Sequence, residues 1–267
     1  MTTTMPKSPT AGTDADFSMK GRIALITGAQ RGIGAAIARR FVASGARVAV
    51  TYLATEASER DATALRRELG EAKLLTLAAD TASSEAMGEA TARVAAAFGD
   101  GPDTLVVNAA ALGKRKWDEI AIDEWDHMMA VNLRGAFIAA LHAVPSMRAK
   151  GYGKVVVIGS VMAHIGDPRA LHYVTSKGGL IAFTRSLARA EGAAGIRVNC
   201  VVPGSILTEQ HFEEGGKVEL GRLAALQSLQ RRGFPDDIAA ACQFLASHAA
   251  DFVTGQVLTV DGGWSNY

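Results

Sequence analysis

The sequence predicts an α/β protein built on a doubly wound parallel sheet of about seven strands, with helices on both faces. Two observations lead to this prediction. Short β-rich runs alternate with longer helical patterns along the chain, and this rhythm indicates right-handed crossovers between parallel strands. The runs 105–107 and 155–158 are continuously apolar, which is typical of strands that are buried on both sides.

The expected elements can be placed along the chain. Strands are expected at residues 22–27, 48–52, 73–79, 103–108, 154–159, 196–202 and 256–260. Helices are expected at residues 33–44, 59–69, 84–98, 123–149, 173–191 and 236–247. Residues 1–18 are rich in Thr, Ser, Pro and Asp and are expected to form a flexible tail. Residues 19–267 are then one domain, a common size for a single α/β unit.

Composition excludes several classes of protein. Hydrophobic residues make up 48% and charged residues 21% of the chain, a globular balance. The net charge of +1 leaves no basic excess for a nucleic-acid partner. No apolar run approaches the ~18 residues of a membrane span, and the first 18 residues do not resemble a signal peptide. Two cysteines, Cys200 and Cys242, are interpreted as buried small hydrophobes in a cytoplasmic protein that binds neither membrane nor metal.

A glycine-rich turn follows the first expected strand, with the sequence TGAQRGIG over residues 27–34. Gly28 allows the sharp turn from strand to helix, Gly32 lets the backbone approach a pyrophosphate, and Gly34 lets the helix pack tightly on the sheet. The N-terminus of the helix attracts the phosphates. In this context the turn predicts a dinucleotide site on a Rossmann-type fold, with cofactor contacts from Gly28, Gln30, Arg31, Gly32, Ile33 and Gly34.

The end of the second expected strand favours NADP over NAD. An acidic residue is expected there in proteins that bind the ribose diol of NAD, but the run Val50-Thr51-Tyr52-Leu53-Ala54 has none. Arg31 places a positive charge in the phosphate-binding turn, although a solvated loop arginine is the alternative. We therefore expect NADP as the cofactor, with NAD as the alternative.

Tyr173 and Lys177 lie four residues apart, on one face of the start of a helix. A tyrosine hydroxyl with a pKa of ~10 is a poor base at neutral pH. A cation within ~4–6 Å stabilises the phenolate and is expected to lower that pKa. Ser160 lies thirteen residues upstream of Tyr173, at the carboxyl end of an expected strand, where ligands bind in open α/β sheets.

These motifs resemble those of the short-chain dehydrogenase/reductase family. The spacing TGxxxGxG, the Tyr173–Lys177 pair, Ser160 and Asn132 all match its pattern. The resemblance implies that Tyr173 transfers a proton and that Ser160 hydrogen-bonds the substrate oxygen. It also implies that Lys177 holds the nicotinamide ribose and that the backbone of Asn132 positions a water.

Further matches extend this resemblance from about residue 19 to the C-terminus. The run Asn108-Ala109-Ala110 stands where the family has Asn-Ala-Gly, so Ala110 departs from the pattern, and the run 254–263 resembles the family's ending. Asp80, after the third strand, matches the residue that contacts adenine, with a helix N-cap or a loop acid as its alternatives. The resemblance implies further cofactor contacts from Asp80, Thr81, Asn108, Pro203, Gly204, Ile206 and Thr208.

Two other classes of protein fit the sequence less well. A non-catalytic dinucleotide sensor is expected to lack Tyr173 or Lys177, yet both are present. A metal-dependent alcohol dehydrogenase needs cysteine and histidine ligands at close spacing, which the two cysteines and six histidines do not supply. His164 and His172 flank the active-site segment and are interpreted as ordinary loop histidines rather than substrate contacts.

The family resemblance leaves the substrate open. A 3-oxoacyl thioester is the first candidate, but the run Glu191-Gly192-Ala193-Ala194 lacks the basic residues that grip an acidic acyl carrier. A sugar, a polyol, a steroid or a small ketone is the alternative. Residues 205–230 are expected to form a lid over a pocket lined by Met162, Ile165, Arg169, Leu171 and Phe212.

Two helices carry more apolar surface than one sheet can cover. Apolar residues spread round the circumference of the segment 128–144, and the helix after Tyr173 has the same character. We expect these helices to pack against their symmetry mates across a two-fold axis. The family resemblance adds a second contact near the last strand and so implies a homotetramer of about 112 kDa.

Overall fold

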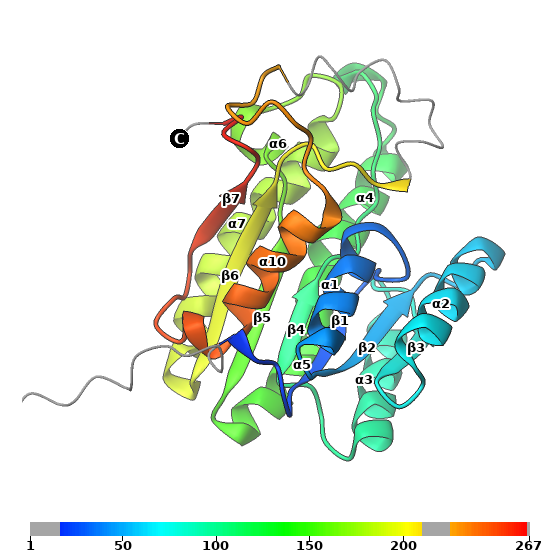
Figure 1. Cartoon of the computed structure of the whole chain (residues 1–267). Helices are drawn as coiled ribbons and strands as arrows, with labels where there is room; N and C mark the ends of the chain where they lie inside the picture. The colour runs from blue at the N-terminus through cyan, green and yellow to red at the C-terminus, as the bar shows by residue number, and fades with distance from the viewer. Residues whose placement is uncertain (1–16, 210–224, 266–267) are drawn as a thin grey trace, which may run out of the picture.

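The computed structural model describes residues 17–209 and 225–265 and contains the predicted parallel sheet (Figure 1). The strands lie in the order β3-β2-β1-β4-β5-β6-β7, and each pairs in parallel with its neighbours. Each predicted strand is confirmed to within one residue at either end. The strands are β1 (Ile23–Ile26), β2 (Arg47–Tyr52), β3 (Leu74–Ala78), β4 (Thr104–Val107), β5 (Gly153–Ile158), β6 (Ile196–Pro203) and β7 (Val257–Val260). The expected tail falls largely outside the described residues.

Helices cover both faces of this sheet, as predicted. One face carries α1 (Gly32–Ala43), α2 (Glu56–Leu69) and α10 (Pro235–Ala246), and the other carries α3 (Ser84–Phe98), α5 (Gly135–Lys150) and α7 (Leu171–Glu191) (Figure 1). Two separate apolar cores result, one on each face. The strands between them are almost wholly buried, which is why their sequences are continuously apolar rather than alternating.

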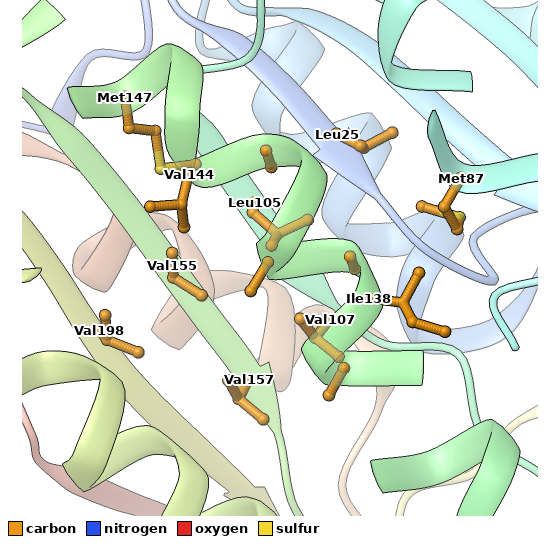
Figure 2. Close-up of a cluster of buried hydrophobic side chains, with 14 of the residues drawn as sticks. Leu25, Met87, Leu105, Val107, Ile138, Val144, Met147, Val155, Val157 and Val198 are labelled. Atoms are coloured by element: carbon orange, nitrogen blue, oxygen red, sulfur yellow. The ribbon is translucent and has the colours of Figure 1, made fainter. Parts of the chain in front are cut away.

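The single helix expected over residues 123–149 is divided in the structure. It consists of α4 (Ile122–Met129), a π-helical turn (Ala130–Arg134) and α5. By length and composition the whole stretch, 122–150, could cross a membrane, but half of its most apolar window is buried. In Figure 2, Ile138, Val144 and Met147 of α5 lie over the strand residues Leu105 and Val155, so this is a core helix.

The order of the strands creates the crevice in which a ligand can bind. The chain runs from β1 outward through β2 to β3, then returns to place β4 on the other side of β1. The connections after β1 and β4 therefore leave the sheet toward opposite faces, and an opening forms at their carboxyl ends. All the predicted site motifs follow the carboxyl ends of strands, so the topology brings them to one edge.

Leu105 tests the contribution of the α5-side core. It is fully buried on β4, beneath α5 (Figure 2). Leu105→Ala should lower the free energy of unfolding by about 2–5 kcal/mol, because it removes apolar contacts and leaves a cavity. Leu53→Ala is the matched control, since Leu53 is 59% exposed and its truncation should have little effect. Urea denaturation measures both, and equal effects would contradict this view of the core.

Candidate functional site

The turn after β1 lies in direct contact with the turn after β4. Gly28 has a φ of +60°, and a Cβ placed on it would lie 2.7 Å from the Cα of Ala109. A Cβ on Gly34 would lie 2.6 Å from the Cα of Ala29. Both glycines are therefore required by close backbone packing, in agreement with the roles expected for them.

Asn108 ties these two turns together. Its side-chain amide donates to the carbonyl oxygens of Thr27 at 3.1 Å and of Gly28 at 2.7 Å. In return, the hydroxyl of Thr27 accepts from the backbone N–H groups of Asn108 and Ala109. The side chain of Asn108, expected to contact the cofactor, thus holds the glycine turn in shape.

The middle of the turn opens toward the segment after β6. Gly32 has a φ of +58°, and a Cβ on it would meet the methyl group of Thr208 at 3.7 Å. Pro203 ends β6, and Gly204 packs so closely on Asp261 that a Cβ would lie 2.6 Å from its Cα. Ile206 is buried and pairs with Gly233 in an isolated bridge. The structure therefore places the segment 203–208, from which the resemblance implied cofactor contacts, beside the glycine turn.

The residues present fit the phosphates of a dinucleotide. The first backbone N–H groups of α1, beginning with Gly32 and Ile33, have no partner within the helix and carry the positive end of its dipole. Because the glycines expose the backbone here, an anion can approach these N–H groups directly.

The glycine turn at residues 27–34, called the dinucleotide cradle below, is bounded by α2. The amide of Gln30 donates to the hydroxyl of Ser58 at 3.3 Å, while its Oε1 is buried without a partner among the described residues. Thr55 caps α2 by accepting from the N–H of Ser58. Arg31 stands at the N-cap of α1 and is partly exposed. Glu56 is the first acidic residue after β2. Its Oε1 lies 2.8 Å from a guanidinium nitrogen of Arg60, and its side chain is largely exposed.

Asp80 and Thr81 lie in different environments. Asp80 is exposed, and its carboxylate accepts from the N–H of Ala82 at 2.9 Å. It is a loop acid and does not cap α3, whose N-cap is Ser83. Thr81 is buried against Gly135, at the junction of the π-helical turn and α5.

Tyr173, Lys177 and Ser160 come together at the carboxyl end of β5. Tyr173 lies in the first turn of α7, and Ser160 follows β5 directly. The Nζ of Lys177 lies 5.8 Å from the centroid of the Tyr173 ring and donates to the carbonyl oxygen of Ile158 at 2.8 Å. Tyr173 is half-buried and its hydroxyl faces that of Ser160, whereas Lys177 is 3% exposed.

Burial controls the ionisation of this group of residues. Burial raises the pKa of Tyr173 above its ordinary value, and the hydrogen bond with Ser160 only opposes that rise. This direction is the reverse of the one expected from the sequence. The reason is that the removal of the Tyr173 hydroxyl from water dominates the shift. Burial also lowers the pKa of Lys177, to about 8. At neutral pH the structure holds a protonated phenol beside a protonated lysine.

Asn132 lies in the π-helical turn and is 1% exposed. Its Oδ1 accepts from the N–H of Ala111 at 2.7 Å, and its Nδ2 donates to the hydroxyl of Ser176 at 3.0 Å. Ser176 in turn donates to the carbonyl oxygen of Tyr173 at 2.7 Å. Ser176 therefore links Asn132 to the tyrosine's own backbone, a role that the sequence did not reveal. Its position three residues after Tyr173 was the available signal.

The histidines and cysteines near the site are partly or fully buried. The expectation that His172 is a loop histidine is wrong. It lies in the first turn of α7 and is fully buried. His164 is half-buried in the short helix α6 (Met162–Ile165). Both cysteines are buried and free, as predicted, and burial raises the pKa of Cys200 to about 11. Among residues 17–209 and 225–265, no group of three His, Cys, Asp or Glu side chains is arranged to hold a metal ion.

The expected substrate pocket is described in part. Met162 is half-buried, whereas Ile165, Arg169 and Leu171 are exposed. Phe212 and most of the expected lid lie outside the described residues.

Known proteins match almost the whole chain. A family model described as enoyl-(acyl carrier protein) reductase matches residues 28–265. Galactitol 2-dehydrogenase (L-tagatose-forming) of Cereibacter sphaeroides is 38% identical, with 93% of this chain and 97% of that protein covered. The 3-oxoacyl-acyl-carrier-protein reductase of Salmonella typhimurium is 37% identical, with 92% and 98% covered. A solved structure of a blue fluorescent protein from a metagenomic library, in complex with NADPH, is 37% identical with a TM-score of 0.84, covering 93% and 99%.

The buried Lys177 predicts how stability depends on pH. Its pKa is about 8 in the folded protein, against an ordinary value of 10.5 that applies to the unfolded chain. Between these values the unfolded chain binds more protons, so the free energy of unfolding should rise with pH across this window. Lys177→Met removes this titration. The free energy of unfolding of the wild type, measured by urea denaturation, should therefore rise by about 3 kcal/mol relative to that of the variant between pH 8 and 10.5. A difference that stays constant with pH would contradict the burial of a charged lysine.

Proposed function

Because the chain belongs to the short-chain dehydrogenase/reductase family, we propose that it interconverts a secondary alcohol and a ketone with Tyr173 as the proton-transferring group. The observation that carries this proposal is the placement of the Tyr173 hydroxyl. It faces the hydroxyl of Ser160 and lies near the buried ammonium of Lys177, at the carboxyl end of the sheet. The glycine turn that fits a dinucleotide lies at the same edge.

These residues divide the chemistry between them. A nicotinamide dinucleotide, when bound, supplies or accepts the hydride. In the reducing direction, Ser160 hydrogen-bonds the substrate's carbonyl oxygen while the Tyr173 hydroxyl donates its proton to that oxygen. The raised pKa of Tyr173 keeps the phenol protonated for this step. In the oxidising direction the phenolate accepts the alcohol's proton, and the ammonium of Lys177 stabilises the negative charge.

Asn132 is linked to the α7 turn that carries Tyr173 through its hydrogen bond to Ser176. Its side-chain amide is engaged by Ala111 and Ser176, so its remaining contribution comes from the backbone of the π-helical turn. Turns of this kind are frequent at functional sites, because they displace one carbonyl from the helical pattern. We assign the positioning of a proton-relay water to that backbone.

NADP is the proposed cofactor, with NAD as the alternative. The N-terminus of α2, with Thr55 and Ser58, faces the turn that carries Gln30 and Arg31. A 2′-phosphate would meet hydroxyl groups, backbone N–H groups and an arginine there, without a carboxylate at the end of β2. A relative at 37% identity is described as a complex with NADPH, which agrees with this proposal.

A 3-oxoacyl thioester is the first candidate substrate. Four apolar side chains on the β4–α4 connection and on the segment between β5 and the first turn of α7 are exposed, which favours an acyl chain: Leu112, Trp117, Ile165 and Leu171. The second candidate is a polyol or a sugar, favoured by the galactitol 2-dehydrogenase at 38% identity and by the absence of basic residues at 192–194. Rates with a 3-oxoacyl thioester and NADPH, and with polyols and NADP, separate the two candidates.

The proposed assembly is a cytoplasmic homotetramer. Phe137 and Leu141, on the outer face of α5, are 55% and 51% exposed. Beside them lies a groove of about 810 Å³, lined mainly by α4, the π-helical turn and α5, with Phe183 from α7. The outer faces of α5 and α7 on a second copy would cover this surface across a two-fold axis. Free, buried cysteines agree with a reducing compartment.

Tyr173→Phe tests the proposed acid/base. The substitution keeps the ring and removes only the hydroxyl, so NADPH binding should persist while turnover falls ~10²–10⁴-fold. Tyr152→Phe is the matched control. The Tyr152 hydroxyl is also buried, but Tyr152 lies at the amino end of β5, at the opposite end of this strand from Ser160. Steady-state rates measure the effect. A Tyr173→Phe enzyme with more than half of the wild-type activity would disprove the mechanism.

Arg31→Ala tests the cofactor preference. The dissociation constant for NADPH should rise about tenfold, because a charge-assisted contact with the 2′-phosphate is lost, while that for NADH changes little. Arg93→Ala, at an exposed position on α3, should leave both unchanged. Fluorescence titration gives the six dissociation constants, for wild type and both variants with each cofactor. Equal weakening of both cofactors would show that Arg31 serves only the shared pyrophosphate.

The molar mass in solution tests the assembly. Light scattering coupled to size exclusion should give about 112 kDa for the 27.9 kDa chain. Phe137→Glu should reduce that mass, because it places a charge in the proposed apolar contact. An active monomer at micromolar concentration would refute the proposed interface, whereas a dimer would retain it and reject only the second contact.

A further inference from the structure

His172 has an unusual environment for a residue adjacent to the proposed proton-transferring group. It lies immediately before Tyr173 in the first turn of α7 and is fully buried. Neither ring nitrogen has a hydrogen-bond partner within residues 17–209 and 225–265. Buried polar atoms without partners are few in native proteins, and an apolar side chain of similar volume would avoid this cost. The mechanism proposed above does not use this imidazole.

A carboxylate faces the imidazole from α4. The Nε2 of His172 lies 3.4 Å from Oε1 of Glu124, within ion-pair range but longer than an ordinary hydrogen bond. The other oxygen of Glu124 accepts from Nε of Arg115 at 2.7 Å. Glu124 therefore stands between His172 on α7 and Arg115 on the β4–α4 connection.

The same chain of contacts continues to the β5–α7 connection. The backbone N–H of Arg115 donates to the carbonyl oxygen of Arg169 at 2.6 Å. Arg169 lies three residues before His172, so the contacts form a closed circuit through Arg115, Glu124, His172 and Arg169. The two connections that it joins are those that follow β4 and β5, and the second of them carries Ser160 and leads to Tyr173.

The imidazole also shapes the β4–α4 connection directly. A Cβ added to Gly113 would lie 3.1 Å from Nε2 of His172 and 3.4 Å from the methyl carbon of Met128. The ring thus occupies the space beside this glycine. The sulfur of Met128 accepts from the amide of Asn132, so the packing around His172 reaches the π-helical turn.

We propose that His172 is a positioning residue, whose ring between Gly113 and the Glu124 carboxylate holds the β4–α4 and β5–α7 connections against the turn of α7 that carries Tyr173. This inference rests on the proposed function, because it concerns the alignment of the substrate's carbonyl with the Tyr173 hydroxyl. Small misplacements of reacting groups cost large factors in rate. The dinucleotide cradle contributes no residue to the circuit, so NADPH binding should be retained when the circuit is broken.

Three variants test the circuit: His172→Gln, Glu124→Gln and the double variant. Each single substitution should lower kcat/KM for the ketone about 10–100-fold, with the dissociation constant for NADPH unchanged. The double variant should be no worse than the more damaged single variant, because both substitutions break one interaction. His142→Gln is the matched control, since this half-buried histidine on α5 pairs with Ser84, away from Tyr173.

A fourth variant covers the case in which His172→Gln does not fold. Gly113→Ala leaves the side chains of His172 and Glu124 in place and only presses a methyl group on the imidazole, so it should also lower kcat/KM without weakening NADPH binding. The proposal is overturned if the single variants retain wild-type kcat/KM, if their effects multiply in the double variant, or if NADPH binding weakens in parallel. A fall in activity with Tyr173→Phe but not with His172→Gln would overturn this inference alone, whereas full activity of Tyr173→Phe would overturn the proposed function.

Discussion

The turn after β1 and the turn after β4 touch through their backbones, and this contact determines where everything else in the site can lie. A side chain at Gly28 would overlap the Cα of Ala109, and the amide of Asn108 spans the same gap with two hydrogen bonds. Parallel strands whose connections leave the sheet in opposite directions would otherwise part at this point. Because the two turns are held together, the N-terminus of α1 opens toward the same edge of the sheet as Ser160 and Tyr173.

The chemistry proposed for this edge depends on burying charge close to the dinucleotide cradle. Lys177 has one hydrogen bond to a backbone carbonyl, and its pKa falls to about 8 because the folded protein excludes water from it. The same exclusion raises the pKa of Tyr173. Burying an ammonium opposes folding, so this part of the fold is less stable than an apolar equivalent would be. The two continuous cores on either side of the sheet offset that cost.

The long helical stretch from α4 to α5 serves both the core and the site. Its inner face covers β4 and β5 (Figure 2). Its π-helical turn presents Asn132 to Ala111 and to Ser176 of α7. This turn separates α4 from α5. Helix α5 lies on the sheet, while α4 carries Glu124, which faces His172. Packing and positioning are therefore features of one continuous segment.

The sequence by itself determined the strands and most of the helices and pointed to the candidate site residues, because these depend on local patterns. An apolar run, a glycine turn at a strand end and a Tyr–Lys pair at helical spacing can each be identified within a short stretch of sequence. Only the tertiary structure decided how those residues are used. The direction of the Tyr173 pKa shift, the inward bonds of Asn108, the link through Ser176 and the burial of His172 all depend on segments distant in the chain. Burial and desolvation arise from what packs around a group, so no pattern along the chain could specify them.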